Sequence, residues 1–370
     1  MIPLITTPSL ALNSSQKGET FPAKPSKEEA HKIFWKLGGD FWKQIIDGKC
    51  HSFGHLVFDQ GLHGGTKEPG FFDSLKIGCH FASEHLSEPL TISFYKDLHK
   101  KLCSHFKGRE NGTEMHAEES GHFRTCGTYA SFSIINDISD FAKERYQIVK
   151  TIEDYTNFRE LAFSSLQGAK EASNTEDIEF WENCIKNTDA GIESWGKRDE
   201  YPAAKEWVTH WERQWKQNGQ KLVEYIEKRC QNSSIPQICS FSYEGIPTLK
   251  LDYKTFENEN EVEKIVEILF DYYNRSIEEI NSRFKDCNSK PDSEMLLDEK
   301  LSVIADLYQM LEWLHPFPDG QGRTDLVLLC KLLCEQGLNP AILHQPYMSS
   351  YSTLQEWKEY LINGINLWKK

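Results

Sequence analysis

Apolar residues recur at helical spacing through the last third of the chain. One series spans residues 262–284, a second spans residues 297–314, and a third resumes over residues 325–334. Intervals of three and four residues place these side chains on one face of a helix, so the pattern predicts three amphipathic helices. Because a proline disfavours helical geometry in the residue before it, Pro316 predicts that the second helix ends at or just before His315.

The rest of the chain mixes helical patterns with short extended runs. A helical pattern starts near Glu28, and the pair Gly38 and Gly39 is expected to divide it. Residues 238–253 alternate between apolar and polar positions around a central group of turn residues, which predicts a β-hairpin. The β-branched and aromatic residues between 129 and 135 predict one further short strand.

These patterns divide the chain into four segments. Residues 1–26, rich in Ser, Thr and Pro, are expected to form a flexible arm. Residues 27–137 and 237–370 are expected to form the two parts of a helical core, and the second part contains the hairpin. The charged, Trp-rich residues 138–236 are expected to form an inserted helical subdomain. The predicted fold class is therefore all-α, with a small β-hairpin and a helical insertion.

Composition excludes several classes of protein. A net charge of −14 argues against a nucleic-acid binder, because phosphate backbones are held by clustered Lys and Arg. The sequence contains no run of about 20 apolar residues, so it predicts no membrane span. The ten cysteines form no Cys-x-x-Cys pair, and the N-terminus lacks the basic region and cleavage site of a signal peptide. We therefore expect reduced thiols and a cytoplasmic protein.

One short loop, His-Pro-Phe-Pro-Asp-Gly-Gln-Gly-Arg at residues 315–323, concentrates chemistry between two predicted helices. Gly320 and Gly322 can adopt backbone angles closed to other residues, so successive N–H groups can converge at the start of the second helix. The positive end of that helix and the guanidinium of Arg323 suit phosphate oxygens. We assign the donor-binding role to these three residues together with Gln321.

The remaining loop residues supply the reactive groups. His315 can take the proton from an incoming hydroxyl, so His315 and Arg323 are the predicted catalytic residues. Asp319 is placed to hold a Mg²⁺ ion that bridges the phosphate oxygens, and Phe317 is the expected buried anchor of the loop. Base, metal ligand and phosphate cradle are the set that transfer of a phosphate-containing group requires.

This loop resembles the signature of Fic (Fido) proteins, His-x-Phe-x-Asp/Glu-Gly-Asn-Gly-Arg-x-x-Arg, and Gly121-His122-Phe123-Arg124 resembles an upstream Gly-x-Phe-Arg of that family. The resemblance covers residues 293–340 well and residues 90–135 loosely. It implies an all-α core whose β-hairpin acts as a flap that clamps a target protein. It also implies a protein nucleotidyltransferase of the AMPylase type or a related enzyme, which transfers AMP, UMP, phosphocholine or a phosphate from a nucleotide donor to a protein hydroxyl.

Two positions depart from the family pattern. Gln321 replaces the Asn of the signature, and Leu326 replaces its last Arg, which in the family contacts the terminal phosphate of ATP. A diphosphate-linked donor therefore becomes an alternative to ATP. Ser352 and Glu356 match an inhibitory Ser/Thr-x-x-x-Glu of the family, but without that arginine the match is better explained as coincidence on a terminal amphipathic helix.

The sequence leaves three functions open. They are group transfer to a target protein, removal of such a group with water as acceptor, and a catalytically degenerate protein-interaction module. The expected partners are a nucleotide and a target protein, with no nucleic acid and no membrane span, and the oligomeric state is not determined. The protein is expected in a cytoplasm, either as a resident enzyme or as a bacterial effector delivered into a host cell cytosol.

Overall fold

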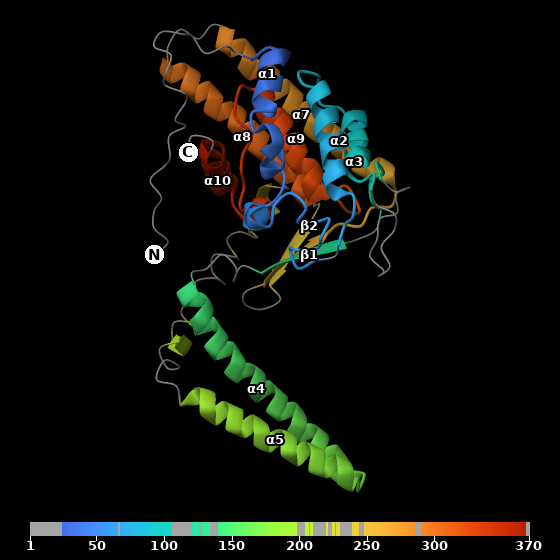
Figure 1. Cartoon of the computed structure of the whole chain (residues 1–370), viewed down its shortest axis with the longest axis vertical. Helices are drawn as coiled ribbons and strands as arrows, with labels where there is room; N and C mark the ends of the chain where they lie inside the picture. The colour runs from blue at the N-terminus through green and yellow to red at the C-terminus, as the bar shows by residue number, and fades with distance from the viewer. Residues whose placement is uncertain are drawn as a thin grey trace. The chain divides into compact units, whose positions relative to one another are not determined.

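The computed structural model of the 370-residue chain divides into two compact units (Figure 1). The first comprises residues 1–129, 225–240 and 252–370, and the second comprises residues 130–224 and 241–251. The structure describes residues 24–65, 67–105, 120–125, 128–133, 140–197, 204–206, 208–209, 220, 224–225, 227–229, 239–243, 248–285 and 290–367. The first 23 residues of the predicted arm therefore lie outside the described residues.

The first unit is helical. Its described elements are α1 (Lys27–Phe34), η1 (Gly38–Gln44), η2 (Gly48–Phe53), α2 (Phe71–Glu84), α3 (Ile92–Leu102), α7 (Glu259–Lys285), α8 (Lys290–Leu314), α9 (Gln321–Glu335), η5 (Pro346–Tyr351) and α10 (Leu354–Asn366). The three helices predicted from the last third of the chain are confirmed as α7, α8 and α9. The predicted division at Gly38 is also confirmed, because α1 ends before the two glycines and a 3-10 helix begins there.

Helix α9 is central to the first unit. It packs against α1, α2, α3 and α8, and Figure 1 shows it between α8 on one side and α2 and α3 on the other. Every residue from Thr324 to Glu335 is buried. This includes Lys331 and Glu335, which form an ion pair one helical turn apart. Burial on all sides gives α9 a fixed position, and its N-terminus follows the candidate loop directly.

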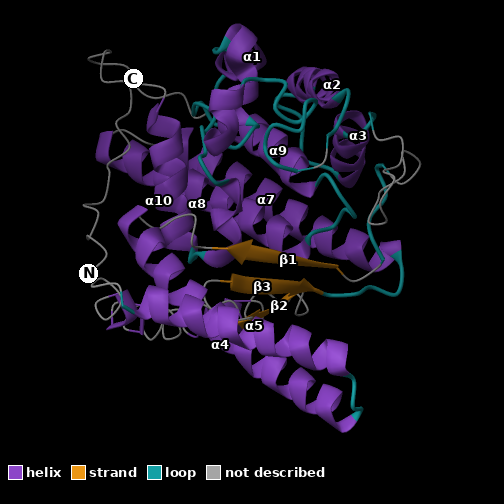
Figure 2. Ribbon diagram, turned by 60° about the horizontal axis from the view of Figure 1, so that its bottom comes forward, coloured by secondary structure: helices purple, strands orange, loops and turns teal. Residues whose placement is uncertain are grey.

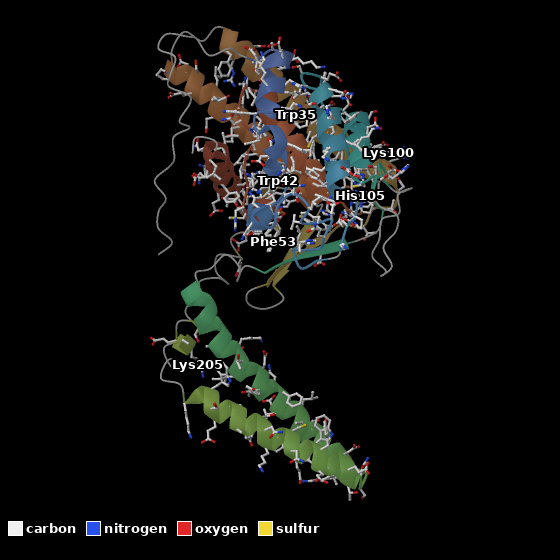
Figure 3. The ribbon with its side chains drawn as sticks, viewed as in Figure 1. Trp35, Trp42, Phe53, Lys100, His105 and Lys205 are labelled. Carbon is white, nitrogen blue, oxygen red and sulfur yellow. The ribbon has the colours of Figure 1, made fainter. Side chains whose placement is uncertain are left out.

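Aromatic side chains fix η1 and the segment after it against the core (Figure 3). The Trp35 ring packs edge-on against Phe41 with 5.3 Å between ring centroids. Trp42 is 6% exposed and packs edge-on against His51 at 5.4 Å. Ile45, Asp47 and Phe58, which line the cavity at the candidate site, therefore follow a well-anchored helical turn.

A small sheet accompanies the helices (Figure 2). Its strands are β1 (Thr128–Ser133), β2 (Cys239–Tyr243) and β3 (Thr248–Tyr253), in the order β1-β3-β2. Strands β2 and β3 confirm the hairpin predicted over residues 238–253, although its turn lies outside the described residues. Strand β1 falls where a short strand was predicted and pairs with β3.

The second unit contains a long helical hairpin. Helix α4 (Asp140–Glu171) and helix α5 (Thr175–Gly196) pack along each other around a small core of Ala162, Leu166 and Ile185. Asn174 begins α5 because its side chain accepts a hydrogen bond from the Asp177 backbone N–H. The mostly helical architecture with a small hairpin confirms the predicted all-α fold class. The insertion was predicted to span residues 138–236, and these bounds remain a prediction.

The sequence also predicted that the cysteines are reduced. The described cysteines Cys50, Cys79, Cys103, Cys184, Cys239, Cys330 and Cys334 are free thiols. Within the described residues, no helix combines the length and the apolar character that crossing a bilayer requires.

Candidate functional site

The 315–323 loop and the start of α9 line a cavity of about 310 Å³ in the first unit. Its wall includes His315, Asp319, Gly320, Gly322 and Arg323, so the structure brings the predicted site residues together around one space. The wall also includes aromatic, apolar and acidic side chains, namely Ile45, Asp47, Phe58, Phe71, Tyr308, Glu312, Leu326, Pro346 and Tyr347.

His315 lies where α8 ends, as Pro316 predicted. Its backbone N–H still donates to the Leu311 carbonyl at 2.8 Å, but its φ of 46° is left-handed and stops the helix. A non-glycine residue rarely adopts this conformation unless its surroundings impose it. The imidazole stacks on the Tyr253 ring at the end of β3, with ring centroids 4.4 Å apart and an interplanar angle of 20°.

Arg124, from the upstream Gly-His-Phe-Arg sequence, holds this helix end in place. Its backbone N–H donates to the Pro316 carbonyl at 2.8 Å. Its guanidinium donates to the carbonyls of His315, Leu314 and Lys254 at 2.5, 2.9 and 2.7 Å. The side chain is 2% exposed. Because one guanidinium satisfies three carbonyls around the α8 terminus, Arg124 explains how the strained conformation of His315 is maintained.

His315 is held in its neutral form. Desolvation, followed by the positive charge of Arg124, lowers the pKa of the imidazole from 6.5 to about 3. Its Nδ1 atom is buried and has no hydrogen-bond partner among the described residues. The imidazole is therefore unprotonated at physiological pH, as a general base must be, although a pKa this far below 7 also makes it a weak proton acceptor.

The loop rests on a buried histidine that the sequence did not single out. The Phe317 ring is fully buried and stacks on His99 of α3, with 3.8 Å between centroids and 7° between planes. His99 Nδ1 accepts a hydrogen bond from the Gly121 N–H at 2.8 Å, and His99 Nε2 donates to the Asp319 carbonyl at 2.8 Å. The predicted anchor role of Phe317 is confirmed, and His99 joins the two motifs.

The two glycines of the loop have different roles. Gly320 caps α9 with a φ of 74°, and a Cβ atom there would lie 2.5 Å from Cys103 Sγ. Gly322 lies in the first turn of α9, has no positive φ, and a Cβ atom there would meet no heavy atom within 4 Å. The prediction that both glycines use backbone angles closed to other residues is therefore wrong for Gly322. Its missing side chain instead leaves open space beside the helix N-terminus.

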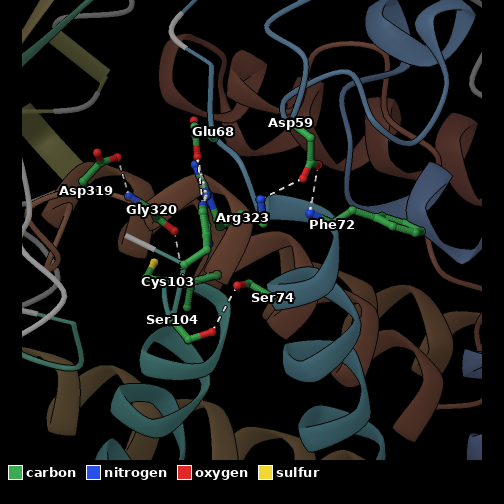
Figure 4. A network of polar contacts seen from close by, with 12 residues as sticks. Asp59, Glu68, Phe72, Ser74, Cys103, Ser104, Asp319, Gly320 and Arg323 are labelled. Atoms are coloured by element: carbon green, nitrogen blue, oxygen red, sulfur yellow. Dashed lines mark hydrogen bonds and ion pairs between the residues drawn. The ribbon is translucent and has the colours of Figure 1, made fainter. Parts of the chain in front are cut away.

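Arg323 is positioned by an acidic partner. Its Nη1 atom donates to Glu68 Oε2 at 2.9 Å (Figure 4). Its guanidinium carbon lies 4.7 Å from the centroid of the Phe71 ring. His105 Nε2 lies 3.3 Å from the same Glu68 oxygen. Glu68 and His105 are almost fully buried, so they hold one edge of the guanidinium. Arg323 still lines the cavity, where a fork of donors suits a phosphate group.

Asp319 has the position and chemistry that a Mg²⁺ ligand needs. Its Oδ1 atom accepts a hydrogen bond from the Gly320 N–H at 2.6 Å, which orients the carboxylate at the cavity wall (Figure 4). Magnesium is commonly bound by one or two carboxylates together with substrate phosphates and water. Asp319 lies next to the start of α9 and supplies one such carboxylate.

Gln321 and Leu326 occupy the two positions that depart from the family pattern. The Gln321 side chain is 1% exposed, accepts from the Phe317 N–H at 3.1 Å and donates to Tyr95 Oη at 2.7 Å and Asp325 Oδ2 at 2.6 Å. It therefore ties the loop to α9, which leaves its backbone for the predicted donor-binding role. Leu326 lines the cavity and presents an apolar surface there.

Glu356 has a structural role at the start of α10. Its carboxylate accepts hydrogen bonds from the backbone N–H and hydroxyl of Thr353, both at 2.8 Å, and the Thr353 hydroxyl accepts from the Glu356 N–H. This capping box accounts for the glutamate that resembled an inhibitory residue.

Four residues around the site could not be assigned from the sequence. His99 and Glu68 carry no motif and lie more than 200 residues before the parts of the loop that they contact. Glu312 carries no motif either, although it lies only three residues before His315. Arg124 was part of a recognised motif, but its contacts with the α8 terminus depend on the fold. A sequence signal existed only for Arg124.

Comparison with known proteins gives a partial match. No family model matches the chain. The chain is 40% identical over 76 residues to the phosphocholine transferase AnkX of Legionella pneumophila subsp. pneumophila (strain Philadelphia 1). The match covers 19% of this chain and 8% of that protein, so the chain spans less than a tenth of the length of its relative.

Proposed function

We propose that this protein is a Fic-like transferase that moves a phosphate-linked group from a nucleotide donor to a hydroxyl of a target protein. The observation that carries the proposal is the pairing of two features on one cavity wall. One is His315, kept neutral by its surroundings, and the other is the α9 N-terminus with Arg323. A proton acceptor and an anion-binding helix end that line the same cavity are what attack of a hydroxyl on phosphorus requires.

In the proposed reaction, the acceptor hydroxyl oxygen forms a bond to a phosphorus of the donor while His315 takes its proton. The bond from that phosphorus to the oxygen of the departing nucleotide breaks, and the leaving group keeps the electron pair. The N–H groups at the start of α9 and the Arg323 guanidinium stabilise the phosphate charge. Mg²⁺ held by Asp319 would supply further charge neutralisation at the phosphate oxygens.

The donor is proposed to be a diphosphate-linked compound rather than ATP. Leu326 and its apolar neighbours offer no positive partner for a terminal phosphate in this part of the cavity. The similarity to a phosphocholine transferase is compatible with a donor other than ATP, because phosphocholine is one of the groups that the resemblance to Fic proteins allows. The β2-β3 hairpin, whose last residue Tyr253 stacks on His315, is the proposed flap that holds the target protein.

The place of action is proposed from the same similarity. A relative in Legionella pneumophila supports a bacterial protein, and we propose a cytosol as its working compartment, with delivery into a host cell as an effector.

The test is a transfer assay with purified protein and Mg²⁺. Radiolabelled ATP, UTP, GTP, CDP-choline and NDP-sugars are offered in turn with a host-cell lysate as acceptor. We expect labelling of the protein itself or of a lysate protein by wild type, and loss of labelling in His315→Ala. His31→Ala, a change of an exposed histidine, is the matched control. Equal labelling by wild type and His315→Ala would reject the catalytic role.

Two other functions give different outcomes. An interaction module would bind a lysate protein without transferring label from any donor. A hydrolase would remove the group from a protein already modified with phosphocholine or AMP, in a His315-dependent way, and would transfer nothing.

A further inference from the structure

Glu312 is a buried acid at the wall of the cavity, one helical turn before His315 on α8. Its side chain is 7% exposed. The Oε1 atom is buried and has no hydrogen-bond partner among the described residues. A buried polar atom without a partner costs free energy comparable to a lost hydrogen bond, so such atoms are rare and require a reason.

The Glu312 carboxyl also interacts with two neighbouring polar side chains. It interacts with the Asp325 carboxyl of α9 and the Tyr308 hydroxyl, one turn earlier on α8. Burial raises the pKa of Glu312 well above its usual value and raises the pKa of Asp325 to about 7. Asp325 is in turn held by Tyr95 at 2.6 Å and by Gln321. This network fixes the Glu312 carboxyl in one orientation.

The surroundings of Glu312 are unsuited to a terminal phosphate. Among the described residues lining the cavity, Arg323 has the sole Lys or Arg side chain, and Glu68 already accepts from it. Asp47 adds a second acidic group to this part of the wall and is paired with Lys49, which also donates to the Tyr347 hydroxyl at 3.3 Å. Leu326 lies where an arginine would be needed. A phosphate there would lose its hydration without gaining a positive partner that is not already committed to a protein group.

The same surroundings suit an uncharged ring system. The aromatic rings of Phe58, Tyr308 and Tyr347 offer flat apolar surfaces, and carboxyl oxygens accept hydrogen bonds from hydroxyl and amino groups. Sugars and bases carry such groups on rings of this kind. An unpaired acceptor beside aromatic walls is thus complementary to a nucleoside.

We propose that Glu312 is a specificity-determining residue, whose carboxyl oxygen accepts a hydrogen bond from a hydroxyl or amino group on the sugar or base of the donor. The inference rests on the proposed function. It adds that this part of the cavity selects a nucleoside and discriminates against a third phosphate. Substitution of Glu312 should therefore weaken this selection.

The test is a binding experiment by calorimetry with wild-type protein, Mg²⁺, and the di- and triphosphates of adenosine, cytidine, guanosine and uridine. The preferred diphosphate is expected to bind at least fivefold more tightly than the matching triphosphate. In Glu312→Leu, the affinity for that diphosphate is expected to fall about tenfold or more, while the affinity for pyrophosphate stays within twofold. Pyrophosphate probes the α9 N-terminus without a nucleoside, so a general structural defect would weaken both ligands.

Glu267→Leu, which replaces an exposed acid on α7, is the matched control and should bind all ligands as wild type does. Folding is checked by thermal melting, because replacing a buried acid with an apolar residue is often tolerated. Equal or tighter binding of triphosphates, or equal loss of diphosphate and pyrophosphate binding in Glu312→Leu, would overturn the inference. His315-dependent transfer from a triphosphate would also overturn it, and with it the proposed diphosphate donor, while leaving the proposed transfer reaction intact. If binding follows the predicted pattern but no donor supports transfer, the inference stands and the proposed function is rejected.

Discussion

The His99 ring lies flat on the Phe317 ring, with 3.8 Å between centroids, and joins the Gly121 N–H to the Asp319 carbonyl through its two nitrogens. These partners fix the tautomer. Nδ1 accepts from an N–H and cannot carry a proton, whereas Nε2 donates to a carbonyl and must carry one. A single neutral imidazole therefore connects the two motifs of the candidate site.

This arrangement predicts that stability depends on pH through His99. Burial lowers the pKa of His99 from 6.5 to about 4. Between these values the unfolded chain binds a proton that the folded protein does not, so stability is lost as the pH falls below 6.5. The free energy of unfolding is expected to fall by up to about 1.4 kcal/mol per pH unit from this group. Urea unfolding of wild type and His99→Gln at pH 6.5 and 5.5 measures the difference.

In His99→Gln the group no longer titrates, so its pH dependence should be shallower than that of wild type. His31→Gln, at an exposed position on α1, should leave the wild-type slope unchanged. Parallel slopes for wild type and His99→Gln would show that His99 does not resist protonation.

Replacing Arg124 by lysine should disrupt the α8 terminus. One ammonium group cannot span the carbonyls of Leu314, His315 and Lys254 that the guanidinium reaches. We expect Arg124→Lys to destabilise the fold by about 2–4 kcal/mol and to reduce transfer at least tenfold. Chemical denaturation and the transfer assay measure the two effects. Arg275→Lys, an exposed change on α7, should alter neither, and wild-type behaviour of Arg124→Lys would refute the holding role.

Alanine substitutions at the two loop glycines should differ in their effect on stability. Gly320→Ala brings a Cβ atom to 2.5 Å from Cys103 Sγ at a φ of 74°, so a loss of about 1–3 kcal/mol of stability is expected. Gly322→Ala meets no atom within 4 Å and should leave stability unchanged or raise it by about 0.5 kcal/mol. Its methyl group would nonetheless obstruct phosphate approach to the α9 N–H groups.

We therefore expect Gly322→Ala to lose at least tenfold in transfer while retaining the wild-type melting temperature. Thermal melting and transfer kinetics on the same preparations separate the two substitutions. Full activity of Gly322→Ala would mean that the donor phosphate binds elsewhere.

The pH profile of transfer should lack an acidic limb above pH 5. A histidine of ordinary pKa 6.5 would be about 90% protonated at pH 5.5, which costs roughly tenfold in the rate of a base-catalysed step. The pKa of His315 is lowered to about 3, so its neutral form persists and kcat/KM should change less than twofold between pH 7 and 5.5. A tenfold fall over that interval would show that His315 does not stay neutral at pH 5.5.

The sequence by itself determined the local features of this protein. Helical spacing and Pro316 fixed where α8 ends, and alternation over residues 238–253 fixed the β-hairpin, because both signals lie within a few residues of their effect. The buried role of Phe317 also followed from its place between two helices. The same local logic failed at Gly322, whose backbone angles are those of an ordinary helix start and not of a strained turn.

Tertiary structure alone decided how the site is supported and which groups face its cavity. Glu68 reaches Arg323 and His99 reaches Asp319 across more than 200 residues of sequence. Glu312 became notable only because packing of α8 against α9 left one of its oxygens without a partner. Motif residues show their chemistry in sequence, whereas the pKa of His315 and the orientation of Arg323 depend on burial and charge from distant segments.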